Sequence, residues 1–111
     1  FLESGGGWVP YVMERLAVRQ KALPHLLPSM TRTVEEYMSS EQLYYSVEPD
    51  ELTVPAIAQI VGDERLVMGS DYAHFDGSAP ESIRLVMQRT DITEDLKQKI
   101  LSDNPARLYN V

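Results

Sequence analysis

The chain has 111 residues, a length that allows one domain at most. Its formal net charge is -7 and its lysines and arginines are scattered, which argues against a nucleic-acid partner. Hydrophobic residues make up 43% and charged residues 24%, a balance typical of a chain that folds in water. There is no cysteine, and no apolar run approaches the roughly 20 residues of a membrane-spanning helix. We therefore expect a cytoplasmic protein without a membrane partner.

The chain opens with an apolar run at residues 1–4, followed by three glycines and a helical pattern. Pro10 suits the first turn of a helix, and apolar residues recur at helical spacing as far as Leu23. The glycine run matches no nucleotide-binding pattern, so we interpret it as a tight turn between strand and helix. Because the chain starts with Phe1 rather than Met, and enters an apolar run at once, we expect a piece of a longer protein.

The remaining elements follow from turn residues, capping patterns and hydrophobic spacing. Thr33 to Glu36 has the pattern of a capping box, and Thr53 and Gly62 are suited to begin and end a helix. Asn104 stands before a proline, where it is expected to cap the last helix. The predicted elements are a helix over about 33–40, a strand over 43–47, a helix over 53–61, a strand over about 65–69, a helix over about 80–88, a helix from 93 and a short helix after 104.

This order is strand, helix, strand, helix, strand and then helices, which predicts an α/β fold. The intervening helices are long enough to act as crossovers between parallel strands. Three parallel strands alone would leave exposed sheet edges. The pattern therefore favours a fragment of a (β/α)8 TIM-type barrel, with about three parallel strands, crossover helices and C-terminal helices. Residues 1–111 are then the C-terminal portion of an incomplete barrel domain.

Each predicted strand ends at polar residues, which in a barrel of this type would meet at one mouth. Ser4, Glu48 and Asp71 stand at these three exits. Asp71 is the strongest candidate, because a carboxylate there can bind a divalent metal ion and accept a proton. The alternative is that Asp71 only caps the turn that follows. The acidic cluster around Asp50 and Glu51 is interpreted as a solvated loop.

His74 and Asp76 follow Asp71 in the order Asp-x-x-His-x-Asp, which could form a local metal site. A solvated histidine on a surface loop is the alternative. With only His25 and His74, the chain by itself cannot form a multi-histidine zinc site. Three methionines at core-like spacing are interpreted as packing residues: Met13, Met68 and Met87.

Four motifs, in order, resemble the carboxyl-terminal third of the amidohydrolase-related proteins. The branch they resemble contains aminocarboxymuconate-semialdehyde decarboxylase and similar aromatic-acid decarboxylases. The motifs are FLESGGGWVPY at residues 1–11, YSVEPDE at 45–51, GSDYAHFDG at 69–77 and NPARLY at 104–109.

The resemblance implies a distorted (β/α)8 barrel with one divalent metal ion, usually zinc, that catalyses nonoxidative decarboxylation or hydrolysis. Asp71 matches the family's metal-binding aspartate on the last strand. The family's histidine before the glycine run is replaced here by Ser4, preceded by Glu3, which implies an altered or lost metal shell. The family's other histidine ligands would lie upstream of Phe1.

Our leading hypothesis is the last part of a metal-dependent hydrolase or carbon–carbon lyase that acts on a small carboxylated or aromatic substrate. Asp71 would bind the metal and handle the proton, and Ser4, Glu48 and His74 would line the substrate pocket. The isolated chain is expected to be inactive. One alternative is a noncatalytic module that self-associates as a homo-oligomer to cover its sheet edges. Another is a metal-free enzyme that uses Glu48 and Asp71 as an acid–base pair.

Overall fold

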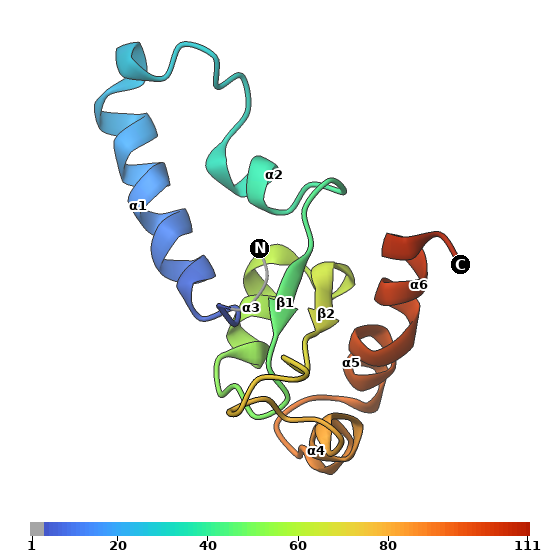
Figure 1. Ribbon diagram of the computed structural model, residues 1–111. Coiled ribbons are helices and arrows are strands. Elements are labelled where there is room, and N and C mark those ends of the chain that lie inside the picture. The colour runs from blue at the N-terminus through green and yellow to red at the C-terminus, as the bar shows by residue number, and fades with distance from the viewer. Residues whose placement is uncertain (1–3) are drawn as a thin grey trace.

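The structure of the chain, a computed structural model, describes residues 4–111. The strand predicted at residues 1–4 therefore lies outside the described residues, except for Ser4, which forms a bend. A short parallel sheet stands at the centre, with helices around it and α1 projecting from the body (Figure 1). The elements are α1 (Trp8–Ala22), η1 (Pro24–Leu26), α2 (Val34–Met38), β1 (Tyr45–Val47), α3 (Val54–Val61), η2 (Asp63–Arg65), β2 (Leu66–Met68), α4 (Ser82–Gln88), α5 (Glu94–Gln98), η3 (Lys99–Asp103) and α6 (Asn104–Tyr109).

The two strands are parallel neighbours joined by the crossover helix α3. Tyr45 pairs with Leu66 and Val47 with Met68, and a hydrogen bond from Gly69 N to Val47 O (2.9 Å) extends the contact by one residue. Each strand is three residues long, shorter than predicted. The structure confirms a parallel β-α-β unit. The part of the chain that it describes forms two strands rather than three and does not close into a barrel.

The two faces of the sheet have different surroundings. Tyr45 and Val47 pack into the apolar core, whereas the alternate residue Ser46 is buried outside the core cluster. Val67 on β2 is likewise buried outside that cluster, because successive side chains of a strand point to opposite faces. One face therefore packs against helices, and the other faces a hollow. The core comprises Val9, Val34, Met38, Tyr45, Val47, Val54, Ile57, Val61, Leu66, Val86, Ile92, Leu96 and Ile100.

Local capping explains two helix boundaries and corrects one prediction. In α2, Thr33 Oγ1 accepts a hydrogen bond from Glu36 N (3.1 Å), and Thr33 N donates to Glu36 Oε2 (2.7 Å), which confirms the capping box. Gly62 ends α3 with a φ of 92°, a conformation that suits glycine. Thr53 is the N-cap residue of α3, as predicted, but its hydroxyl makes no capping hydrogen bond and donates instead to Glu51 Oε1 at 2.6 Å.

The C-terminal helices form one continuous helical segment, in which the middle turn η3 is a π-helix. The predicted cap at Asn104 is therefore wrong. Asn104 is completely buried, and its Nδ2 donates to the backbone oxygens of Asp63 and Leu66, each at 2.8 Å. These bonds fasten the C-terminal segment to the beginning of β2.

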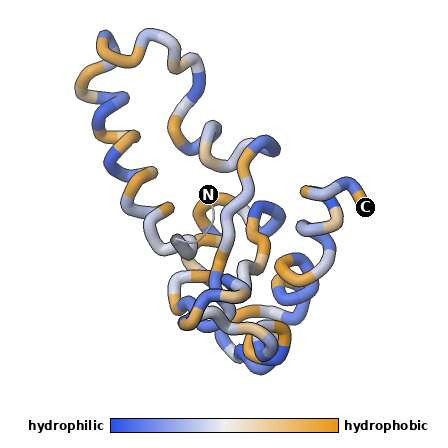
Figure 2. The backbone as a smooth tube through the Cα atoms, viewed as in Figure 1, coloured by the Kyte–Doolittle hydropathy of each residue, from blue (hydrophilic) through white to orange (hydrophobic). Residues whose placement is uncertain are grey.

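Helix α1 is buried only near its start, at Val9. Tyr11 and Val18 are 67% and 50% exposed, and hydrophobic residues alternate with hydrophilic ones along the projecting helix (Figure 2). The radius of gyration is 15.3 Å, larger than the roughly 13 Å of a compact domain of this length. The projection of α1 explains the difference.

The predicted packing roles of the methionines have mixed outcomes. Met13 and Met68 are partly buried against the core, as predicted. Met87 is 50% exposed on α4, so its predicted core position is wrong. Among the helices of residues 4–111, none has the length and apolar character that a membrane crossing requires.

Candidate functional site

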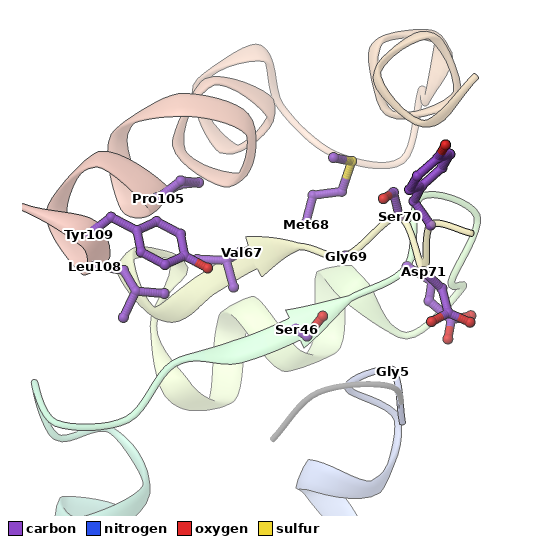
Figure 3. A pocket seen from close by; sticks show the side chains of 12 residues that line it. Gly5, Ser46, Val67, Met68, Gly69, Ser70, Asp71, Pro105, Leu108 and Tyr109 are labelled. Carbon is purple, nitrogen blue, oxygen red and sulfur yellow. The ribbon is translucent and has the colours of Figure 1, made fainter. Parts of the chain in front are cut away.

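A hollow of about 500 Å³ lies beside the sheet face that carries Ser46 and Val67 (Figure 3). Its polar side lies at the carboxyl ends of the strands, and its apolar wall comes from β2 and α6. In Figure 3, Leu108 and Tyr109 lie at the opposite end of the hollow from Asp71. The lining residues are Gly5, Ser46, Glu48, Val67, Met68, Gly69, Ser70, Asp71, Tyr72, Pro105, Leu108 and Tyr109.

Asp71 lies where the chain turns sharply out of β2. Its φ of 51° is left-handed, a conformation that aspartate adopts more readily than most residues. The following loop closes on itself, since His74 N donates to Asp71 O (2.8 Å) and Ser78 N to Ser70 O (2.9 Å). A Cβ at Gly77 would lie 2.5 Å from Asp71 O, so glycine is needed for close backbone approach. Together these features fix the backbone position from which the Asp71 side chain projects.

Three potential metal ligands gather on this loop. His74 Nδ1 donates to Asp76 Oδ1 at 2.6 Å and lies 3.6 Å from Asp71 Oδ2. The hydrogen bond from His74 lowers the pKa of Asp76, because it favours the ionised carboxylate. One ligand atom from each of the three residues lies within 4.8 Å of the others.

This donor set fits a divalent cation. Ligand atoms held tetrahedrally around one zinc ion at about 2.0–2.2 Å lie roughly 3.3–3.6 Å apart, so the three ligand atoms, now within 4.8 Å of one another, would have to move closer by about 1 Å. Imidazole and carboxylate are suitable ligands for zinc and similar ions. Ligation through His74 Nδ1 would replace the proton that it now donates to Asp76.

The four predicted site residues lie in different places. Glu48 and Asp71 both line the main hollow, and both also line a smaller adjoining one. Ser4 is exposed and is absent from the lining of the main hollow. His74 is absent from that lining too, and lines a separate small hollow beside Tyr72. The structure therefore places Glu48 and Asp71 in the lining of the same hollow, and places His74 near Asp71 along the loop.

Glu51 has a structural role that the sequence did not indicate. Its two carboxylate oxygens accept hydrogen bonds from Gly6 N at 3.0 and 2.9 Å, and its Oε2 also accepts from Glu48 N at 3.3 Å. With the bond from Thr53, the carboxylate joins the glycine turn to the loop after β1. The interpretation of Glu51 as part of a solvated loop is wrong. Its partner Gly6 is 45 residues away, so no local pattern reveals the contact.

Sequence reasoning also missed Ser46 and the apolar wall from α6. Ser46 lies between two core residues of β1, and strand alternation was the available signal that it faces the other side. Leu108 and Tyr109 were placed on the last helix, but their position beside the hollow depends on how that helix docks.

A comparison with protein families matches residues 1–111 to the amidohydrolase family. The match covers the whole chain, and the chain therefore belongs to the amidohydrolase family. A search of the curated proteins finds no significant match.

Proposed function

We propose that this chain supplies the carboxyl-terminal part of a metal-dependent amidohydrolase active site, with Asp71 as metal ligand and proton acceptor. The observation that carries the proposal is the position of Asp71. Its carboxylate lies at the exit of β2, lines the main hollow, and has an imidazole and a second carboxylate within ligand distance.

The chain's own residues would divide the work between the two ends of the hollow. When bound, a divalent metal ion supplies Lewis acidity, which raises the acidity of water and polarises a substrate carbonyl. The Asp71 side chain is 34% exposed, so its carboxylate can exchange protons with a substrate or with water. Glu48 adds a second carboxylate on the same side, while Leu108 and Tyr109 provide an apolar wall opposite.

Metal binding by the Asp71→Asn variant tests this proposal. Asparagine keeps the shape of the side chain and tolerates the left-handed backbone, so the fold should persist. We expect the affinity for Zn²⁺, measured by calorimetric titration, to fall about tenfold or more. Asp103→Asn, an exposed change on η3, is the control and should leave the affinity unchanged. Equal affinities in the wild type and Asp71→Asn would overturn the proposal.

The substrate class and the reaction are further parts of the proposal. We infer a small aromatic or carboxylated substrate and either hydrolysis or nonoxidative decarboxylation in the complete enzyme. The hollow is polar near Asp71 and apolar near Tyr109, which supports a substrate that is polar at one end and apolar at the other. Assays of aromatic carboxylic acids and their amides, with release of carbon dioxide or of amine as the two readouts, would separate the reactions.

A second candidate function is self-association, which the exposed apolar residues of α1 and η1 favour. Tyr11, Val18 and Leu26 are all at least half exposed on this projecting region. Light scattering of the purified chain tests it, because a monomer at high concentration would remove its basis. Replacing Tyr11 and Val18 with serine should shift an oligomer towards the monomer.

A further inference from the structure

Ser46 is a buried hydroxyl on the wall of the main hollow. The residue is 6% exposed, and within residues 4–111 its Oγ makes no hydrogen bond. Buried side-chain polar groups nearly always have a partner. Among the described residues, Asn104 Oδ1 is the side-chain polar atom that is both fully buried and without a hydrogen bond. Ser46 Oγ also has no hydrogen bond, so it must be accessible from the hollow that Ser46 lines. A hydroxyl in this situation is available to a molecule that enters the hollow.

Gly69 leaves the space that this hydroxyl occupies. A Cβ at Gly69 would lie 2.5 Å from Ser46 Oγ but 3.9 Å from Ser46 Cβ. The clash therefore concerns the hydroxyl and not the rest of the serine side chain. An alanine at position 69 would force Ser46 to rotate its hydroxyl to another staggered position.

The surroundings of Ser46 define what it can bind. Val67 is its neighbour on β2, and Leu108 and Tyr109 extend the apolar wall in Figure 3. Glu48 and Asp71 lie on the other side and disfavour a second negative charge beside Ser46. A neutral hydroxyl group on an apolar body satisfies both conditions, because it can donate to and accept from the serine.

We propose that Ser46 is the specificity-determining residue of this hollow, that it hydrogen-bonds a neutral hydroxyl substituent of a small apolar-bodied substrate, and that Gly69 positions it. This inference rests on the proposed function, since it assigns a role within the same site. It differs in its test, which uses no metal.

Phenol and toluene are the probes, because they have similar size and differ in the hydroxyl group. Their dissociation constants would be measured by amide NMR titration of the metal-free chain. In the wild type, phenol should bind more tightly than toluene, with shifts at Ser46 and Val67. In Ser46→Ala, phenol affinity should fall about fivefold, the effect of one hydrogen bond, while toluene affinity stays the same.

Gly69→Ala provides a second, independent variant. It removes no polar group, yet it should reproduce the phenol loss of Ser46→Ala by turning the hydroxyl away. The double variant should lose no more than Ser46→Ala alone, because alanine at 46 has no Oγ to clash. Ser102→Ala, an exposed change on η3, is the control and should bind both probes like the wild type.

Three results would overturn the inference: no binding of phenol at the hollow, equal phenol affinity in the wild type and Ser46→Ala, or losses that multiply in the double variant. Zn²⁺ titration separates these results from failure of the proposed function. Ser46→Ala should keep the metal affinity of the wild type, because Ser46 is not one of the three ligand donors at the Asp71 loop.

Discussion

Both carboxylate oxygens of Glu51 accept hydrogen bonds from the single backbone N–H of Gly6, at 3.0 and 2.9 Å. The contact joins two segments that bound the same hollow, since Gly5 and Glu48 both line it. A Cβ at Gly5 would lie 3.1 Å from Glu51 Oε2, so the glycine turn fits closely around the carboxylate. The turn and the β1 exit loop are therefore held as one unit.

Glu51→Ala should destabilise the chain by about 1–3 kcal/mol, because it leaves partly buried backbone donors without an acceptor. Glu51→Gln should cost less, since its amide oxygen can still accept from Gly6 N. Urea unfolding followed by circular dichroism measures both changes. The neighbouring exposed residue provides the control, Asp50→Asn, which should be close to neutral. If Glu51→Ala were as stable as Asp50→Asn, the carboxylate would not hold the turn.

Asn104→Ala should cost about 2–4 kcal/mol, because it removes the donor to two backbone carbonyls in a fully buried position. Asn104→Asp should be at least as damaging, since a carboxylate would face two carbonyl oxygens without a hydrogen to donate. Chemical denaturation measures both free energies of unfolding. A loss of under about 0.5 kcal/mol for Asn104→Ala, within the range of surface substitutions, would contradict this role.

His74→Ala should weaken Zn²⁺ binding, because it removes one of the three donors that gather at the Asp71 loop. His25→Ala is the matched control, an exposed histidine in η1 at the far end of α1. Calorimetric titration of both variants measures the effect. Equal losses in the two variants would mean that zinc binds histidine nonspecifically.

The ion pair between Asp91 and Arg89 should make the stability of the chain depend on pH. Arg89 donates to both of its carboxylate oxygens, at 3.0 and 2.6 Å, and this hydrogen bonding lowers the pKa of Asp91. A lowered pKa means that the ionised form stabilises the fold at pH values above the unfolded-state pKa, near 3.9. That stabilisation is lost as the pH falls through the lower folded-state pKa.

Asp91→Asn should therefore be less stable than the wild type at neutral pH, and the two should converge in acid. Urea unfolding of both proteins across the acidic range measures the difference. Arg89 also donates to Pro49 O (3.1 Å), and this bond persists in the variant. A difference in stability that did not change with pH would contradict the assignment.

The elements that sequence predicted well are those whose signals are local. The Thr33–Glu36 capping box and the glycine at the end of α3 lie within a few residues of the boundaries that they set. The position of Asp71 at the end of β2 followed from an apolar run that stops at polar residues.

The features that sequence did not predict depend on distant contacts. Thr53 has the residue type of a helix cap, but a carboxylate two residues before it competes for the hydroxyl. Asn104 precedes a proline, yet its partner at Asp63 is 41 residues away. Alternation along β1 indicates that Ser46 points away from the face of Tyr45 and Val47, but it does not indicate a hollow there, because Leu108 and Tyr109 reach that side only through the docking of α6.

The π-helical turn η3 carries an extra residue relative to a regular α-helical turn. Deleting one residue there would rotate everything downstream by about 100° around the helix axis. Such a deletion would swing Asn104 off its two carbonyls and turn Leu108 and Tyr109 away from the space they now border. The position of Leu108 and Tyr109 at the hollow thus depends on the length of this turn as much as on their side chains.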